Sequence, residues 1–230
     1  MNVTLQGLSR SGMKTVIIGA SGGIGRALAD ALEDEGSSVI RLSRPQIDIT
    51  DEASIAAAAV TVGTPDLLIV ATGLLHEGDR GPEKAIRELD AAWLARQYAV
   101  NAIGPALVAK HFLPIMPRTG RSIFAVMSAR VGSISDNRLG GWYGYRASKA
   151  ALNQLVRTLA IEDKRRNDRG IVVALHPGTV DTKLSKPFQQ SGRDLFQPDR
   201  AAVQLLDLID GLKPQDSGKL FTWDGVEIVP

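Results

Sequence analysis

The 230-residue chain is long enough for one domain with a full hydrophobic core, and its 44% hydrophobic and 23% charged content is ordinary for a globular protein. Basic and acidic residues are interspersed and leave a net charge of +2, which excludes a basic stripe for nucleic acid. No apolar run approaches the roughly 18 residues of a transmembrane helix, no signal-peptide pattern is present, and the lack of cysteine excludes disulfides. We therefore expect a cytoplasmic protein with no membrane or nucleic-acid partner, whose ligand is a small molecule.

Two kinds of apolar segment alternate along the chain. Short runs rich in β-branched residues predict strands, and segments with helical periodicity follow them. The expected strands are 14–20, 37–43, 66–73, 122–128, 171–178 and, as the last one, 218–223. The expected helices are 24–34, 51–59, 83–100, 105–116, 143–166 and 199–209. This alternation predicts a Rossmann-type, doubly wound α/β fold, with a parallel sheet of about seven strands and helices on both faces.

A glycine-rich stretch, GASGGIG at residues 19–25, joins the first strand to the first helix. At this position a dinucleotide pyrophosphate meets a helix N-terminus, and glycines let phosphate oxygens approach the backbone amides. The glycine spacing is wider than G-x-G-x-x-G, so the stretch alone is also compatible with a plain strand-to-helix turn.

The second strand ends at Ser43 and Arg44, where an NAD-binding domain usually has an acidic residue on the ribose 2′-hydroxyl. Arg44 can instead pair bidentately with a 2′-phosphate, which favours NADP(H) over NAD(H), with Ser43 as a second donor. A solvated surface arginine would look the same in sequence. Asp48 either reaches the adenine amino group or serves as a helix N-cap or Asx-turn residue.

The stretch GWYGYRASKAAL at residues 141–152 contains two tyrosines and a lysine. Residues four apart share a helix face, so Tyr145 faces with Lys149 and Tyr143 does not. A nearby ammonium favours the phenolate and lowers the pKa of a phenol from about 10 towards the range of general acid catalysis. The pair therefore predicts proton transfer, although an isolated Y-x-x-x-K is equally compatible with a solvated helix face.

These motifs come in a familiar order. The glycine loop, Asn101 in VNAIGP, the Y-x-x-x-K pair and PGTVDT at 177–182 resemble the short-chain dehydrogenase/reductase family in order and spacing. The resemblance covers the chain from Lys14 onward. GGWYGYRASKAALN, with SARVGSISDN before it and GKLFTWDG at the end, is most similar to the short C-factor-like and sniffer-type carbonyl reductases.

The resemblance implies a role for each member of a catalytic set. Tyr145 would protonate the carbonyl oxygen, Lys149 would lower the pKa of Tyr145 and hold the nicotinamide ribose, and Asn101 would bind a relay water through its backbone. The Pro177-Gly178 turn would pass the nicotinamide. The residues expected to contact the nucleotide are Gly19, Ser21, Gly22, Gly23, Ile24, Gly25, Ser43, Arg44, Asp48, Ile49, Ala71, Thr72, Gly73, Tyr145, Lys149, Pro177, Gly178, Val180 and Thr182.

The chain departs from the family pattern at two strand ends. The family's substrate-binding serine corresponds to Ala129, and Ser128 would face the other way unless the strand end bends. We include Ser128 in the expected catalytic set; alternatively Ser133 or Ser135 replaces it, or the enzyme works with one donor fewer. The family's asparagine after the strand at 66–73 is also absent, and Thr72 is expected to supply part of its hydrogen bonding.

We expect residues 13–230 to form a single dinucleotide-binding catalytic domain after a flexible leader at 1–12. The irregular segment 183–197 is expected to be a short substrate lid over an open pocket for small or medium carbonyl compounds. The three histidines share no metal-ligand spacing, so no metal site is expected. A homodimer or homotetramer is implied by the resemblance.

The sequence thus predicts an NADP(H)-dependent oxidoreductase that interconverts a carbonyl and an alcohol. The alternative is a catalytically weakened nucleotide-binding signalling or regulatory module of the same fold. Ala129 separates the two hypotheses, because an enzyme needs a further donor near the carbonyl oxygen and a nucleotide sensor does not.

Overall fold

A computed structural model describes residues 12–188 and 195–229 of the chain. Within these residues, seven strands form one sheet in the order β2-β1-β3-β4-β5-β6-β7, and all neighbours pair in parallel except β6 with β7. The strands are β1 (Lys14–Ile18), β2 (Ser38–Leu42), β3 (Leu67–Val70), β4 (Ser122–Met127), β5 (Gly170–His176), β6 (Leu220–Thr222) and β7 (Glu227–Ile228). The expected Rossmann-type sheet is confirmed.

One detail of the expected sheet is wrong, because β6 is not the last strand. The chain turns back after β6, where the Gly225 amide donates to the Thr222 carbonyl at 2.9 Å and Gly225 adopts a φ of 83°. The Thr222 amide then donates to the Val226 carbonyl at 2.9 Å, which starts the antiparallel pairing of β7. A two-residue strand after a tight turn has too little periodicity to be recognised in sequence.

The helices are α1 (Gly23–Asp34), α2 (Glu52–Val62), α3 (Ala91–Tyr98), α4 (Gly104–Phe112), α5 (Tyr143–Asp163) and α6 (Pro198–Gly211). The helix expected from residue 83 begins only at Ala91, because Asp90 caps it by accepting the Trp93 amide at 2.8 Å. A π-helical turn, Ala99–Ile103, joins α3 to α4. Among the described residues, no helix is both long and apolar enough to cross a membrane.

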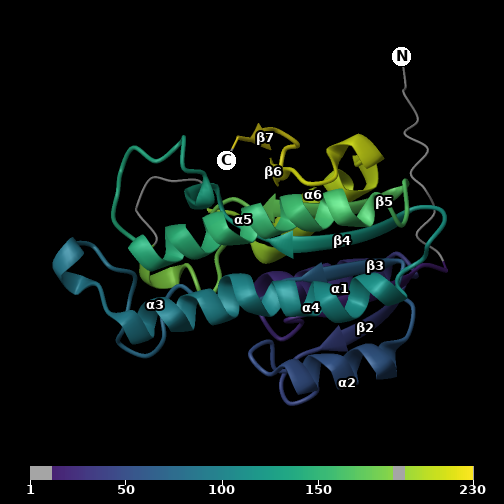
Figure 1. Ribbon diagram of the computed structural model, residues 1–230, viewed down its shortest axis with the longest axis horizontal. Helices are drawn as coiled ribbons and strands as arrows, with labels where there is room; N and C mark the ends of the chain where they lie inside the picture. The colour runs from purple at the N-terminus through teal and green to yellow at the C-terminus, as the bar shows by residue number, and fades with distance from the viewer. Residues whose placement is uncertain (1–11, 189–194, 230) are drawn as a thin grey trace.

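Helices cover both faces of the sheet. α1 and α6 pack on one face, where Leu28 and Leu205 belong to one buried cluster. α2, α4 and α5 pack on the other, where Phe112 and Leu152 belong to a second cluster. Successive residues of each central strand enter different clusters, so the sheet is buried on both sides. Figure 1 shows α4 and α5 lying across the second face, with α2 at the β2 edge and β7 at the opposite edge.

The strand order places a ligand site at the carboxyl ends of the central strands. β2 and β3 pair on opposite sides of β1, so the direction of winding reverses there. In open α/β sheets this reversal leaves a crevice outside the carboxyl ends of the strands, where ligands bind. The glycine loop follows β1 directly and enters α1 at this crevice.

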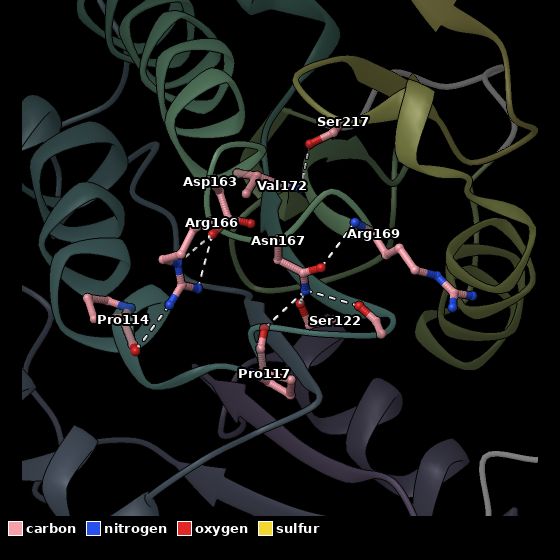
Figure 2. Close-up of polar contacts among 10 residues, drawn as sticks. Pro114, Pro117, Ser122, Asp163, Arg166, Asn167, Arg169, Val172 and Ser217 are labelled. Carbon is pink, nitrogen blue, oxygen red and sulfur yellow. Dashed lines mark hydrogen bonds and ion pairs between the residues drawn. The ribbon is translucent and has the colours of Figure 1, made fainter.

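The opposite end of the sheet is closed by buried polar contacts around Asn167, which Figure 2 shows. Its side-chain amide donates to the carbonyls of Pro117 and Gly120 at 3.0 Å and to Ser122 Oγ at 3.2 Å. Its Oδ1 accepts the Arg169 amide at 3.0 Å. Asn167 is 2% exposed, and its hydrogen bonds join the turn after α5 to the start of β4. This contact lies at the end of the sheet opposite the crevice.

Two expected segments fall partly outside the described residues. Of the expected leader, only residue 12 is described, and of the expected lid, residues 189–194 are not. The described part of that lid contains a 3-10 turn, Lys186–Phe188.

Candidate active site

A cavity of about 820 Å³ opens at the carboxyl ends of β3, β4 and β5. The predicted site residues that line it are Ile24, Ala71, Thr72, Gly73, Ser128, Tyr145, Lys149, Pro177, Gly178, Val180 and Thr182. Those outside its lining are Gly19, Ser21, Gly22, Gly23, Gly25, Ser43, Arg44, Asp48, Ile49 and Asn101. The fold therefore gathers segments that are more than a hundred residues apart in sequence around one hollow.

Tyr145 and Lys149 lie on one face of α5 and line this cavity. The Lys149 amine is 5.8 Å from the centre of the Tyr145 ring and donates to the Met127 carbonyl at 2.8 Å. Burial lowers the pKa of the Lys149 amine to about 7 and raises the pKa of the Tyr145 phenol to about 12. The expected lowering of the tyrosine pKa is therefore wrong for the protein alone, because burial disfavours the charged phenolate.

Asn101 is fully buried in the π-helical turn and ties three elements together. Its side chain accepts the Leu74 amide and donates to the Leu74 carbonyl, both at 2.8 Å, and donates to Ser148 Oγ at 3.1 Å. Ser148 in turn donates to the Tyr145 carbonyl at 2.9 Å. The contacts described thus fix α5, and with it Tyr145, to the loop after β3. Single π-helical turns of this kind are frequent at functional sites.

Ser128 is not placed as a partner of Tyr145. Its hydroxyl donates to Asn153 Oδ1 at 2.7 Å. Asn153 lies two helical turns beyond Tyr145 on α5, a rise of about 12 Å for eight residues. Ala129 instead packs in one apolar cluster with Tyr145 and Leu75. The Ser128 hydroxyl is thus engaged by Asn153 in the ligand-free protein, and its membership of the catalytic set stays a prediction.

The two alternative serines point elsewhere as well. Ser133 Oγ donates to the Val229 carbonyl at 2.5 Å and accepts the Asp136 amide at 3.2 Å. Ser135 Oγ reaches the same Val229 carbonyl at 3.4 Å. Both hydroxyls thus fasten the loop after β4 to the end of the chain beyond β7. The hydrogen bonds of Ser128, Ser133 and Ser135 in the ligand-free protein favour the third alternative, a site with one hydroxyl donor fewer than the family pattern, and this stays a prediction.

The glycine loop is built for close backbone approach. A side chain at Gly25 would collide with the Gly19 carbonyl oxygen, and one at Gly23 would lie 2.7 Å from Thr182 Cγ2. α1 begins after Gly22 without a side-chain N-cap, so its first amides have no capping hydroxyl or carboxylate. Such a helix N-terminus suits a phosphate, which accepts hydrogen bonds from the free amides.

Thr72 follows β3 and faces the cavity without a partner. Its Oγ1 is buried and makes no hydrogen bond within the described residues. The expected replacement of the family's asparagine by Thr72 is therefore wrong. The Asn101 contacts to Leu74 hold this loop instead. The orphaned hydroxyl is the kind of group that a polar ligand satisfies.

At the end of β2 the structure leaves the role of Arg44 open and shows the Asx turn of Asp48. Ser43 Oγ accepts the Ser21 amide at 2.9 Å, which joins β2 to the glycine loop. Arg44 is exposed and has no hydrogen-bond partner among the described residues. Asp48 Oδ1 accepts the Thr50 amide at 2.9 Å and its hydroxyl at 2.7 Å, which is the Asx-turn alternative. These Thr50 hydrogen bonds, and to a lesser degree the Arg44 charge, hold the pKa of Asp48 below its usual value.

Three further predicted residues are placed by packing. Ile49 is 8% exposed and belongs to the core cluster beneath α4, so it does not face the cavity. Val180 is buried against Phe196, with which it forms an isolated bridge. The Thr182 amide donates to Ser185 Oγ at 3.2 Å. Thr182 therefore links the glycine loop, through its contact with Gly23, to the segment that follows it at 183–188.

Comparisons with known proteins identify the family of this chain. The family model described as enoyl-(acyl carrier protein) reductase matches residues 44–207. C-signal of Myxococcus xanthus is 35% identical over 173 residues, which cover 75% of this chain and 96% of that protein. The 1-hydroxy-2-glutathionyl-2-methyl-3-butene dehydrogenase of Rhodococcus sp. (strain AD45) is 30% identical over 228 residues, 93% of this chain and 98% of that protein. The chain belongs to the short-chain dehydrogenase/reductase family of oxidoreductases.

Solved structures of similar proteins share the fold. The NADPH-bound carbonyl reductase from chicken fatty liver superimposes with a TM-score of 0.81 at 24% identity, covering 97% of each chain. Carbonyl reductase Sniffer of D. melanogaster superimposes with a TM-score of 0.78 at 21% identity, covering 94% of this chain and 99% of that one. The expected family and the expected fold are thus confirmed.

Sequence reasoning missed several residues of this short-chain dehydrogenase/reductase site. Asn153 shares a helix face with Lys149 at a spacing of four, so helical periodicity could have found it. Glu83 is 3% exposed and contacts the start of α5, but no motif surrounds it in the sequence. His176 lines the cavity with an unpartnered Nδ1, and burial lowers its pKa to about 4. No cluster of three metal-ligating side chains occurs within the described ranges.

Proposed function

We propose that this chain is an NADP(H)-dependent carbonyl reductase or alcohol dehydrogenase in which Tyr145 transfers the proton. The observation that carries the proposal is the position of Tyr145 and Lys149. They lie together on one face of α5 and line a cavity that the glycine loop adjoins at the carboxyl ends of the strands. Their burial in this cavity at the carboxyl ends of the strands, where ligands bind in open α/β sheets, favours a chemical role over a solvated helix face.

The chain offers matching partners for each part of the nucleotide. The uncapped N-terminus of α1 suits the pyrophosphate, and the glycine cradle leaves room for it. The orphaned Thr72 hydroxyl suits a ribose or amide group. Arg44, exposed at the end of β2 and not neutralised by a hydrogen-bonded carboxylate among the described residues, suits a 2′-phosphate. These residues fit NADP(H) better than NAD(H), since the nearby Asp48 is already engaged by Thr50.

NADPH held by these residues would supply the hydride for the carbonyl carbon. Tyr145 donates its phenolic proton to the carbonyl oxygen as that oxygen becomes an alkoxide, which yields the alcohol and a phenolate. Lys149, with a pKa of about 7, provides a charge that stabilises this phenolate and a route by which it regains a proton from solvent. Asn101 holds the loop after β3 and, through Ser148, the backbone of Tyr145.

The test is NADPH oxidation by the purified protein over a panel of aldehydes, ketones, quinones and diketones, with NADH in parallel. Turnover with NADPH that disappears in Tyr145→Phe is the expected result. Turnover that persists in Tyr145→Phe would exclude this tyrosine as the proton donor.

A second candidate function is supported by Ala129 and by the missing hydroxyl donors around Tyr145. In this reading the chain binds the nucleotide as a ligand and acts as a signalling or regulatory module of the same fold. Tight NADPH binding with no turnover over the whole panel would favour it over the reductase.

A further inference from the structure

The chain enters α5 through three residues with positive φ, a conformation that the last of them, Trp142, disfavours. Gly140, Gly141 and Trp142 have φ values of 63°, 64° and 53°, and Trp142 is the one non-glycine residue with positive φ in the described ranges. The left-handed conformation is disfavoured for an L-residue and is a genuine outlier for a bulky side chain. Such residues persist where the surroundings impose them, and they cluster at functional sites.

Glu83 imposes this conformation from the loop before α3. The Trp142 amide donates to the Glu83 carbonyl. The Glu83 carboxylate, 3% exposed, accepts the Gly144 amide and the Gln97 side-chain amide, both at 3.1 Å. Glu83 therefore caps the N-terminus of α5, a task that a side chain at the N-cap position usually performs. The N-cap position itself, residue 142, is left free for an indole.

The indole of Trp142 lies between Tyr145 and the described part of the lid. Its ring centre is 6.2 Å from that of Tyr145 at an interplanar angle of 70°. It is 5.5 Å from that of Phe188 at 66°. Phe188 also packs against His76, whose Nε2 is 3.1 Å from the Lys183 carbonyl oxygen. The Trp142 indole thus contacts Phe188 and Tyr145, the residue of the proposed proton transfer.

The walls around Tyr145 are apolar. Its cluster contains Leu75 and Ala129, with partly buried residues packed on it, namely Val131, Trp142, Leu184 and Phe188. Of the charged side chains that line the cavity, Arg130 and Asp136 are paired with each other at 2.6 Å. Arg146 donates to the carbonyls of the loop at 140 and 141. A substrate carbonyl at Tyr145 therefore has an aromatic surface beside it.

We propose that Trp142, held by Glu83, is the specificity-determining residue of this site, and that its indole packs on the flat unsaturated group of an aromatic or conjugated carbonyl substrate. This inference rests on the proposed reductase function. Aromatic rings prefer edge-to-face or offset contacts with other rings, which add to the burial of apolar area. A saturated ring of the same size has no such preference.

The test uses Trp142→Gly, because glycine accepts the left-handed backbone and the variant loses only the indole. Benzaldehyde and cyclohexanecarbaldehyde have the same ring size and differ in unsaturation. Their ratio of kcat/KM is measured in wild type and variant, so that intrinsic reactivity cancels. We expect the preference for benzaldehyde to fall by about tenfold in Trp142→Gly, and Trp142→Phe to restore most of it. Tyr143→Ala, at an exposed neighbouring position, should leave the ratio unchanged.

Glu83→Gln tests the positioning role without removing volume. We expect it to reduce the same ratio, to change the near-ultraviolet circular dichroism of the aromatic residues, and to leave NADPH affinity near that of wild type. An unchanged ratio and spectrum would overturn the role of Glu83.

Binding of the alcohols separates this inference from the proposed function. Benzyl alcohol and cyclohexylmethanol are titrated into the protein and followed by ligand-observed NMR. Tighter binding of benzyl alcohol that is lost in Trp142→Gly supports the inference, even if no aldehyde is turned over. Turnover with a ratio that Trp142→Gly leaves unchanged overturns the inference and leaves the reductase standing, as does an absence of any aromatic preference in both assays.

Discussion

The Lys149 amine lies 5.8 Å from the centre of the Tyr145 ring, and both side chains are buried, at 2% and 8% exposure. Burial therefore disfavours the charged form of each group, and no carboxylate pairs with the Lys149 amine in the contacts described. Their electrostatic coupling is strongest when Lys149 is protonated and Tyr145 has lost its proton, which is the state that the proposed protonation of a carbonyl would leave.

The burial of Lys149 predicts a dependence of stability on pH. The folded pKa of about 7 lies below the unfolded value of 10.5, so between these values the unfolded chain binds the extra proton. The free energy of unfolding should therefore rise with pH from 7 to about 10. Urea unfolding of wild type and Lys149→Met at pH 7 and pH 9 should show that this rise exceeds that of the variant by about 2 kcal/mol. Parallel pH profiles for the two proteins would contradict a desolvated amine.

The apolar position beside Tyr145 predicts a gain of function. Ala129→Ser would place a hydroxyl next to the phenol and should raise kcat by about tenfold to a hundredfold, since removal of one oxyanion donor costs about 10²–10³ elsewhere. Ser128→Ala should change kcat by about twofold at most, because its hydroxyl is bound to Asn153. Steady-state kinetics with a common aldehyde tests both variants. A loss of activity in Ser128→Ala as severe as in Tyr145→Phe would show that Ser128 belongs to the catalytic set.

The cofactor preference depends on Arg44. Arg44→Ala should weaken NADPH binding by about 1.5–3 kcal/mol, the size of a charge-assisted contact, and leave NADH binding nearly unchanged. Arg41 is the matched control, since it lies on β2 but pairs with Asp30 at 2.5 Å and Glu33 at 2.7 Å. Arg41→Ala should leave both affinities near wild type. Equal losses for NADPH and NADH in Arg44→Ala, measured by fluorescence titration, would exclude a 2′-phosphate contact.

The unpartnered hydroxyl of Thr72 predicts effects of opposite sign on stability and binding. Thr72→Val keeps the side-chain shape and removes a buried, unsatisfied hydroxyl. We expect the ligand-free protein to gain about 1 kcal/mol in unfolding free energy and the nucleotide to bind about fivefold more weakly. Chemical denaturation and nucleotide titration measure the two effects. A destabilised variant with unchanged nucleotide affinity would show that the hydroxyl has a structural partner instead.

Asn167 provides a structural contrast at the far end of the sheet. Asn167→Ala removes the amide that the carbonyls of Pro117 and Gly120 and Ser122 Oγ share, and it leaves buried acceptors unsatisfied. We expect a loss of about 3 kcal/mol in unfolding free energy with NADPH affinity within about twofold of wild type. A large loss of affinity in protein that remains folded would mean that this end of the sheet communicates with the crevice.

Much of the fold follows from local patterns. Short β-branched runs and helical segments alternate, and their order was enough to predict the parallel sheet, because buried parallel strands and amphipathic helices have different periods. The predicted bounds are wrong where contacts with other segments determine where an element begins or ends. The helix expected from residue 83 starts at Ala91 because Asp90 caps it and because Glu83 is used elsewhere, at the start of α5. β7 exists because a tight turn brings two residues back beside β6.

The features of the site also divide into those that follow from local patterns and those that depend on distant segments. The sequence by itself determined the family, the glycine loop and the pairing of Tyr145 with Lys149, because each depends on residue type and on spacing along one element. Only the tertiary structure decided that Ser128 bonds to Asn153, that the tyrosine pKa is raised, and that an indole at residue 142 stands beside Tyr145. Hydroxyl direction, desolvation and aromatic contact depend on atoms brought together from distant segments, and a linear pattern carries no information about those distances.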